Sequence, residues 1–243
     1  MRWKAILVAI AAYQLSQRRP ALVKKVIRTA ALKQLPPEVD VDTHFKPHYD
    51  PWDQRLCFVP DADRFRSLRH GRASVITGTI DTFTEGGVRL HSGEVFEADL
   101  VVTATGLNLK PFGSIALTVD GAKVDVADTM AYKALMLSGV PNFAFTIGYT
   151  NASWTLKADL VADYVCRLLA HLDEHGHREA RAVPDPDVQP TPFLPLSSGY
   201  IRRSLDLLPQ QGDRDPWRLR QNYLYDVRSI RRDRIDDGVL SFT

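Results

Sequence analysis

Cysteine is scarce in this chain, with two among 243 residues. Two cysteines are too few for a disulfide framework, which favours a reducing, cytoplasmic location. Long apolar runs are missing as well, because no run approaches the roughly 20 residues that a membrane-spanning helix requires. The content of 44% hydrophobic and 25% charged residues is ordinary for a globular protein with a core.

Excess charge is also missing, since 31 basic residues face 29 acidic ones and the net charge is +2. This balance gives no reason to expect a nucleic-acid partner. The charges are unevenly distributed, however, because no acidic residue precedes Glu38. The basic residues of that first segment are Arg2, Lys4, Arg18, Arg19, Lys24, Lys25, Arg28 and Lys33.

Apolar residues of the basic segment recur at helical spacing on both sides of Pro20. They predict two amphipathic helices with a basic outer surface. The first of these helices includes the apolar run Ala5–Ala12, which imitates a signal peptide. The basic surface has two interpretations, a solvated face or a peripheral contact of residues 1–35 with a membrane surface.

Several familiar motifs are absent: the sequence has no G-x-G-x-x-G, P-loop, G-x-S-x-G, H-E-x-x-H or C-x-x-C. No segment is therefore expected to cradle a pyrophosphate by itself. The spacing of His171, His175 and His177 would suit a metal. They fall at a predicted helix end, where cationic side chains stay exposed, and no metal site is expected. Cys57 has no candidate partner base and is expected to be a small core residue.

Hydrophobic periodicity predicts an α/β fold. Ser74–Phe83, Val88–His91 and Val95–Phe96 alternate between apolar and polar. Turn signals at Glu85-Gly86-Gly87 and His91–Glu94 separate them, which predicts a β-meander. Asp99–Gly106 and Phe143–Ile147 are apolar runs, which are expected to form strands buried on both faces, as in a parallel sheet.

Helices are expected in the second half of the chain. One follows Asn151, its predicted N-cap, and ends at Gly176. Asp215-Pro216 is expected to open another, because proline is favoured at the first helical position. The prolines of residues 183–195 predict an extended connector.

Two features have a functional interpretation. Ala104-Thr105-Gly106 ends a predicted buried strand, where small residues let the backbone approach a ligand at the carboxyl edge of an α/β sheet. The structural alternative is a tight strand exit. The turn between Ile147 and Leu156 leads into a helix N-terminus, whose N–H groups and dipole suit an electron-rich ligand group.

Three segments carry a family resemblance: Tyr49-Asp50-Pro51-Trp52-Asp53-Gln54-Arg55-Leu56-Cys57, Asp99–Gly106 with Leu107-Asn108-Leu109, and Gly148–Lys157. They resemble FAD-dependent class B monooxygenases of the Baeyer–Villiger type, in particular those that activate the thioamide prodrug ethionamide. The likeness extends to Gly199-Tyr200 and Asp215–Leu219, so it covers nearly the whole chain.

The resemblance implies the C-terminal portion of a flavoprotein with two dinucleotide-binding domains, containing parts of Rossmann-like NADPH and FAD domains, a β-meander and helical segments. Its implied parts are a basic amphipathic helical segment (1–43), the end of the NADPH-binding domain with the meander (44–105), the end of the FAD-binding domain (106–182), and a proline-rich connector with a C-terminal helix (183–243). Family members carry glycine-rich FAD and NADPH loops, and neither loop occurs here. The chain is therefore expected to be truncated, with Met1 as an internal methionine, a frameshift remnant or a misassigned start.

Site residues also follow from the resemblance. Arg55 resembles an active-site arginine beside the flavin and the nicotinamide, where a permanent charge stabilises an anion. The alternative for Arg55 is a surface ion pair, for example with Asp53. The cofactor-binding residues implied are Ala104, Thr105 and Gly106 near the flavin, and Asn151, Ala152, Ser153 and Trp154 at the helix start that faces its ring.

The implied activity is a monooxygenase that uses FAD, NADP (as NADPH) and O2. Its substrate would be a ketone, oxidised by the Baeyer–Villiger reaction, or the sulfur of a thioamide or sulfide. The alternative is a catalytically inactive remnant or a binding module that needs a complementing N-terminal half. Self-association into a homo-oligomer is left open.

Overall fold

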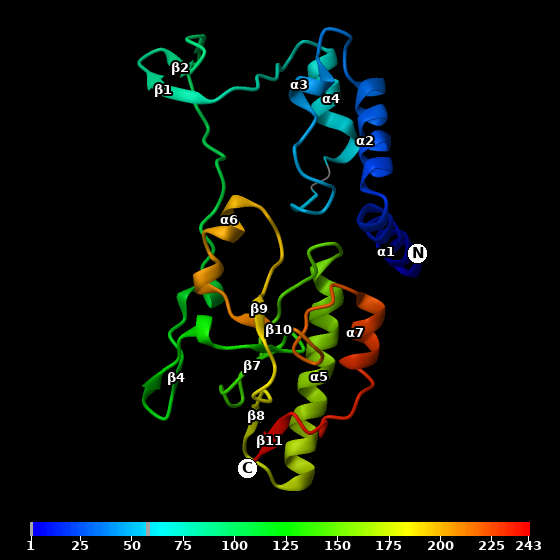
Figure 1. Ribbon diagram of the computed structural model, residues 1–243, viewed down its shortest axis with the longest axis vertical. Coiled ribbons are helices and arrows are strands. Elements are labelled where there is room, and N and C mark those ends of the chain that lie inside the picture. The colour runs from blue at the N-terminus through cyan, green and yellow to red at the C-terminus, as the bar shows by residue number, and fades with distance from the viewer. Residues whose placement is uncertain (1, 57–58) are drawn as a thin grey trace. The chain divides into compact units, whose positions relative to one another are not determined.

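The computed structural model of the protein describes residues 2–56 and 59–243. Cys57 lies outside the described residues, so its place in a core stays a prediction. The chain forms two compact units (Figure 1). One unit is Leu15–Leu107, and the other combines the residues up to Gln14 with Asn108–Thr243. The four segments that the resemblance implies stay a prediction.

Two helices begin the chain, as predicted. Helix α1 spans Arg2–Arg18 and α2 spans Pro20–Gln34. Pro20 suits the first position of α2, because a helix leaves the N–H at that position unpaired. In α1, the predicted apolar face included Trp3, Ile6 and Leu7. Ile6 is buried, but Trp3 and Leu7 expose 57% and 52% of their surface, so the prediction is wrong at both of these residues.

Short helices complete the apolar core of the Leu15–Leu107 unit. They are α3 (Val41–His44), the 3-10 turn η1 (Pro60–Ala62) and α4 (Asp63–Arg69). The core residues are Ala31, Leu35, Val41 and Leu68. Arg28 of α2 donates two hydrogen bonds, of 3.0 and 2.5 Å, to the carboxylate of Asp42 in α3. This bidentate pair fixes the two helices to each other.

The predicted β-meander is confirmed. Strands β1 (Ile80–Thr84), β2 (Gly87–Leu90) and β3 (Val95–Glu97) form an antiparallel sheet in that order. The first strand begins later than the sequence predicts. A Cβ atom at Gly87 would overlap the carbonyl oxygen of Phe96, so the β1–β2 turn requires glycine at this position.

The strand predicted for Asp99–Gly106 is wrong. These residues take part in no strand, and Leu100 and Val102 expose 80% and 79% of their surface. A strand buried on both faces needs neighbouring strands and covering layers. In the described part of this unit the one sheet is the meander, which the segment does not join. Asp99–Gly106 is therefore an exposed apolar stretch.

A 22-residue helix, α5 (Trp154–His175), runs through the other unit beside the shorter α7 (Tyr223–Ser229) (Figure 1). Helix α5 ends at Gly176, whose φ of +68° is the left-handed conformation expected of a C-cap glycine. Its buried side recurs every three or four residues. The residues of that side are Leu156, Lys157, Leu160, Val161, Tyr164, Leu168 and Leu172.

Small antiparallel sheets complete this unit, which makes the fold a mixture of α and β elements. The paired strands are β4 (Thr118–Val119) with β5 (Ala122–Lys123), β6 (Ala131–Tyr132) with β7 (Met136–Leu137), β8 (Ala180–Ala182) with β11 (Leu240–Phe242), and β9 (Pro190–Pro192) with β10 (Gln210–Gly212). The connections include η2 (Pro111–Ser114), η3 (Val126–Asp128), α6 (Gly199–Arg202) and η4 (Leu205–Leu207). The predicted proline-rich connector therefore contains a strand, β9.

The second predicted buried strand, Phe143–Ile147, is also wrong. Ala144 forms a single bridge with Met136, and Phe145 N–H donates to the carbonyl of Leu135 at 2.8 Å. Residues along this segment alternate between half-buried and exposed. The segment therefore pairs with β7 and its neighbour without forming a strand of its own.

Two predicted helix starts are shifted. Ser153, and not Asn151, occupies the N-cap of α5, because the Asn151 side chain donates to the carbonyl of Gln221 at 2.9 Å. The last helix begins at Tyr223, after a turn that contains the cis Asp215-Pro216 peptide. Asn222 caps this helix by accepting hydrogen bonds from Leu224 N–H and Tyr225 N–H, whereas the Asp215 carboxylate pairs with Arg220.

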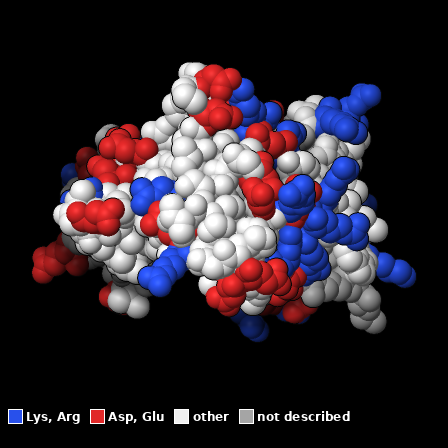
Figure 2. Space-filling view, turned by 90° about the horizontal axis from the view of Figure 1, so that it is seen from below, with Lys and Arg blue, Asp and Glu red and all other residues white. Residues whose placement is uncertain are grey.

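The surface carries charges of both signs. On the face that Figure 2 shows, acidic and basic side chains lie in small interspersed groups around uncharged surface. Among the described residues, no helix is long and apolar enough to cross a membrane.

Candidate functional site

The first turn of α5 is exposed at Ser153, Trp154 and Thr155. The hydroxyl of its N-cap, Ser153, contacts the Thr155 hydroxyl at 2.8 Å and makes no capping bond to the backbone. No acidic side chain lies in this turn. The N–H groups and the positive dipole end of a 22-residue helix are thus available to an electron-rich group.

Gln221 holds the loop that leads into α5. Its side-chain Oε1 accepts from Thr150 N–H at 2.9 Å, and its backbone carbonyl accepts from the Asn151 side chain, also at 2.9 Å. The backbone of Gln221 has φ of +51°, a left-handed conformation that is unusual for this residue type. The side-chain Nε2 is buried and has no hydrogen-bond partner among the described residues.

The buried ion pair of Lys157 and Asp226 contacts the same loop through Tyr149. Tyr149 donates its phenolic hydrogen to Asp226 Oδ2 at 2.6 Å, and Lys157 Nζ donates to that oxygen at 2.9 Å. Lys157 also donates to the carbonyl of Lys133 at 3.3 Å. Burial lowers the pKa of Lys157, while the pairing with Asp226 acts in the opposite direction. Burial raises the pKa of Tyr149, and the Asp226 charge adds to this effect.

Trp154 closes the loop on its other side. Its indole lies against Gly148, where any Cβ atom would overlap the ring. Half of the Trp154 surface remains exposed. Residues 148–154 thus form a folded loop in which the half-exposed Trp154 ring packs on Gly148.

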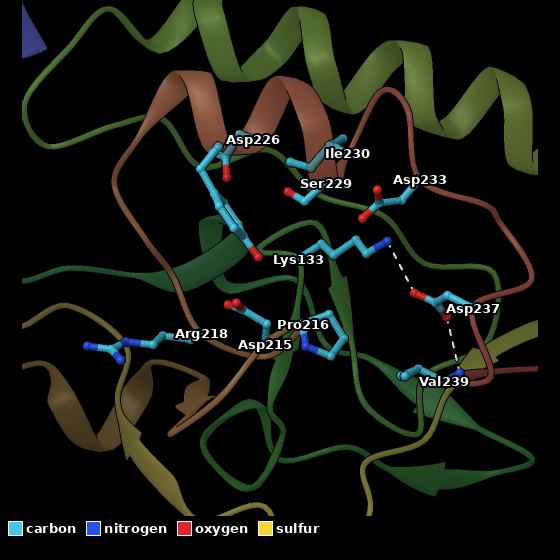
Figure 3. Close-up of a pocket in the computed structure, with 11 residues that line it drawn as sticks. Lys133, Asp215, Pro216, Arg218, Asp226, Ser229, Ile230, Asp233, Asp237 and Val239 are labelled. Carbon is cyan, nitrogen blue, oxygen red and sulfur yellow. Dashed lines mark hydrogen bonds and ion pairs between the residues drawn. The ribbon is translucent and has the colours of Figure 1, made fainter.

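A cavity of about 200 Å3 lies against α7, which contributes Tyr225, Asp226 and Ser229 to its lining (Figure 3). Lys133 extends across it, and its Nζ lies 3.1 Å from Asp237 Oδ2. Three of its lining carboxylates have cationic partners: Asp237 pairs with Lys133, Asp226 with Lys157 and Asp215 with Arg220. Because these charges are already paired, the cavity fits a structural charge network better than a catalytic centre.

Tyrosines extend this network into the core. Tyr132 donates to Asp237 Oδ2 at 2.5 Å and contacts the Tyr164 hydroxyl at 3.2 Å. The Lys133 ammonium lies 5.2 and 5.5 Å from the centres of these two rings, which is cation–π distance. Burial raises the pKa of Tyr132 and of Tyr164.

The predicted site residues fall into two groups. Asn151, Ala152, Ser153 and Trp154 lie together at the start of α5, where the first two are half-buried and the others exposed. Arg55, Ala104, Thr105 and Gly106 belong to the Leu15–Leu107 unit, and all four are exposed. The structure therefore brings together the predicted residues of the α5 start, and the association of Arg55 with a cofactor stays a prediction.

The histidine cluster packs as aromatic rings. The centres of His171 and His175 are 4.2 Å apart, and His171 and His177 lie 4.8 and 5.4 Å from Phe242. Within residues 2–56 and 59–243, no three potential ligand side chains are grouped in a way that could hold a metal ion.

Sequence reasoning missed Gln221, Asp226, Lys133 and Lys157. A signal existed for Lys157, which falls on the apolar face of α5 one turn before Val161. A charged residue at such a position needs a buried partner. Nothing in the sequence marks that partner, Asp226, because it lies 69 residues further along the chain.

Known proteins resemble this chain over its whole length. The "FAD-containing monooxygenase EthA" of Mycobacterium tuberculosis is 53% identical over 243 residues, which are all of this chain and 50% of that protein. The Mycolicibacterium smegmatis protein of the same name is 51% identical, with 100% and 49% covered. The "Probable FAD-binding monooxygenase AlmA" of Acinetobacter baylyi is 47% identical, with 95% and 46% covered.

No protein-family model matches the sequence, and no solved structure does either. The chain spans about half the length of the curated relatives that it matches. The matched part of the Mycobacterium tuberculosis protein is its C-terminal half. This chain therefore corresponds in sequence to the C-terminal half of the FAD-containing monooxygenases.

Proposed function

We propose that this chain supplies the C-terminal part of a flavin-dependent monooxygenase that uses FAD, NADPH and O2. The substrate would be a ketone, oxidised by the Baeyer–Villiger reaction, or the sulfur of a thioamide or sulfide. The start of α5 carries the proposal, because an uncapped helix end without acidic residues suits the electron-rich ring of a flavin.

The residues of this loop fit that cofactor. Asn151, Ala152, Ser153 and Trp154 would hold the flavin ring at the N-terminus of α5, where the dipole favours negative charge on the ring. Bound FAD would supply the redox chemistry, with NADPH as the electron source and O2 as the oxidant.

The other predicted site residues belong to the Leu15–Leu107 unit, and each has a proposed role. Arg55 would place its guanidinium beside the reacting centre, because this group keeps its charge and donates several hydrogen bonds. Ala104, Thr105 and Gly106 would let the backbone approach the flavin, since none has a large side chain.

A complementing polypeptide belongs to this proposal. The sequence lacks a glycine-rich dinucleotide loop, and the apolar residues Leu100 and Val102 are exposed. An exposed apolar stretch with strand-forming residues suits pairing with another polypeptide. We propose that this polypeptide carries the glycine-rich loops, as the resemblance implies. The alternative is a binding module or a catalytically inactive remnant, for which the same exposed stretch would be the contact surface.

A membrane contact is a second candidate for α2. Leu22 and Val26 are at least half exposed on this helix, beside Lys24 and Lys25. Co-sedimentation with anionic liposomes that is lost in high salt would support this contact. Recovery in the supernatant at low salt would exclude it.

The activity is tested with a chimera in which the N-terminal half of the Mycobacterium tuberculosis relative precedes this chain. We expect the chimera to oxidise NADPH with FAD present and to convert a ketone or a thioamide. The Arg55→Ala variant should keep FAD and lose product formation. A chimera that binds FAD and forms product equally well with Arg55→Ala would contradict the role of Arg55.

A further inference from the structure

An apolar groove of about 450 Å3 lies along the second half of α5, entirely within the unit that contains Asn108–Thr243. One wall is α5 itself, and the other is formed by residues 142–144 and by Met136 of β7. The groove shares no lining residue with the cavity of Figure 3. The helix contributes four aliphatic residues, which are Val165, Leu168, Leu169 and Leu172.

Contacts within the unit fix the wall opposite α5. The Asn142 side chain donates to the carbonyl of Arg178 at 3.0 Å and accepts from Ala180 N–H at 3.0 Å. Ala144 forms a bridge with Met136. The groove is therefore already formed in the free chain, so a partner would not have to order its walls.

Apolar surface remains uncovered in this groove. Leu169 exposes 56% of its surface, Ala144 is also exposed, and Val165 is half-buried. Exposed apolar surface that is gathered in one groove marks an interaction site, whereas single exposed apolar residues do not. Because Ala144 has a small side chain, the backbone of a partner could approach this wall closely.

The sequence of the same wall also calls for a second covering layer. Phe143–Ile147 is an apolar run of the kind that is buried on both faces of a sheet. In the structure Phe145 and Ile147 pack against a core of their own unit, whereas Ala144 lines the groove. The run is thus covered on one side by the unit itself, and the groove follows its other side.

The curated relatives contain a polypeptide that could provide this layer. This chain matches the C-terminal half of the Mycobacterium tuberculosis protein, so an N-terminal half of similar length accompanies the matched part there. It is present in one copy for each groove. A second copy of this chain fits less well, because two-fold pairing would place one groove against another and leave a void between them.

We infer that the groove between α5 and residues 142–144 seats the N-terminal half of an FAD-containing monooxygenase, whose apolar side chains cover Val165 and Leu169. This inference rests on the proposed function, which calls for a complementing polypeptide. It gives that polypeptide a contact on the Asn108–Thr243 unit, in addition to the exposed stretch at Leu100 and Val102.

Thiol labelling at position 169 tests this contact without FAD. Leu169→Cys is combined with Cys166→Ser, because Cys166 is exposed on the same helix, and the labelling of Cys166→Ser alone is subtracted. We expect a maleimide to react about tenfold more slowly at position 169 in the chimera than in the free chain. The matched control is Leu207→Cys, at a residue 51% exposed outside the groove, and it should react equally in both proteins.

Leu169→Lys gives an independent test in the same two proteins. The Leu169 side chain is exposed in the free chain, so its replacement should leave thermal unfolding unchanged there. In the chimera the ammonium would be buried against the seated half, and the thermal midpoint should fall by about 2–4 °C. Leu207→Lys should shift neither protein. A midpoint that falls in neither protein, or equally in both, would overturn the inference.

The labelling outcomes distinguish this inference from the proposed function. Protection at position 169 in a chimera that binds no FAD supports the seat and overturns the proposed function. A chimera that binds FAD but is labelled at position 169 as fast as the free chain overturns the seat alone. Equal slowing at positions 169 and 207 overturns it too, since the protection would not be specific to the groove. A free chain that is already protected and elutes as a dimer shows a second copy in the groove, which also overturns the inference.

Discussion

The phenolic oxygen of Tyr149 lies 2.6 Å from Oδ2 of Asp226, and this contact joins the loop before α5 to α7. Lys157 completes the arrangement by donating to the same oxygen. The side chains of Lys157 and Asp226 expose 2% and 7% of their surface, so both charges depend on each other. The geometry of the candidate cofactor loop therefore depends on a buried ion pair.

Breaking this pair should destabilise the unit strongly. Asp226→Asn leaves the Lys157 ammonium buried without a counter-charge, which typically costs about 3–5 kcal/mol. We expect a matching decrease in the free energy of unfolding, measured by urea denaturation with tryptophan fluorescence. Adding Lys157→Met should recover much of the loss, because it removes the unpaired charge.

Asp163→Asn is the matched control for Asp226→Asn. Asp163 of α5 pairs with Arg231, and both side chains are more than 40% exposed. Exposed ion pairs contribute about 0–1 kcal/mol, so this variant should unfold near the wild-type urea midpoint. Equal losses in the two variants would show that the burial of the Lys157–Asp226 pair is not important.

Stability should fall steeply with pH above about 10.5. Burial raises the pKa values of Tyr132, Tyr149 and Tyr164 above the ordinary value of 10.0. In the unfolded chain these tyrosines ionise near pH 10, whereas the folded state keeps their protons, so their contribution is present below pH 10 and lost above it. Above pH 10, each of these tyrosines therefore lowers the free energy of unfolding by about 1.4 kcal/mol per pH unit. Burial lowers the pKa of Lys157, so this residue makes stability rise with pH, but only below its ordinary pKa of 10.5.

Urea unfolding at pH 10.5, 11 and 11.5 measures this slope. Tyr149→Phe should reduce the slope, because the phenylalanine ring has no proton to retain. A wild-type slope that remains flat through this range would contradict the burial of the three hydroxyl groups.

Gly148→Ala should disturb the loop before α5 through Trp154. The new methyl group would overlap the indole, so Trp154 must move or the backbone must shift. Overpacking of this kind costs about 1–3 kcal/mol. Trp154→Ala in the same chain should relieve most of the loss, since it removes the overlapping ring.

The control for this substitution is Gly199→Ala in α6, where the nearest side-chain atom belongs to the flexible Arg203. We expect thermal unfolding of Gly199→Ala at the wild-type temperature. Additive losses for Gly148→Ala and Trp154→Ala would rule out the contact between the two residues.

Charged residues in the exposed apolar stretch should reduce self-association of the free chain. Leu100→Lys with Val102→Lys adds charge where both side chains are about 80% exposed, so the folded core should be unaffected. We expect lower light scattering at high concentration and weaker FAD retention in the chimera. Ile115→Lys, at another exposed aliphatic residue, should change neither property. An unchanged chimera would contradict the proposed pairing of this stretch.

Local patterns predicted the elements that depend on nearby residues. The meander follows from alternation and the Gly87 turn, and α5 ends at Gly176 because the left-handed C-cap favours glycine. Patterns failed where a distant residue competes. Asn151 is a good N-cap by type, but its side chain binds Gln221, which lies 70 residues away.

The candidate site shows the same division. The helix start at residues 151–154 is predictable from a turn followed by an amphipathic segment. Its supports, Gln221 and Asp226, come from a turn and a short helix whose tertiary contacts no local spacing encodes. The strand predicted at Asp99–Gly106 is wrong because its apolar pattern describes an environment that the surrounding unit does not provide.

The visible absorption spectrum of the purified chimera tests the central claim most directly. After incubation with FAD and removal of unbound cofactor, we predict a retained flavin band for the chimera. The N-terminal half of the relative by itself should retain much less, because the α5 loop would be missing. A colourless chimera, or equal retention by the N-terminal half alone, would contradict the claim that this chain builds part of a flavin site.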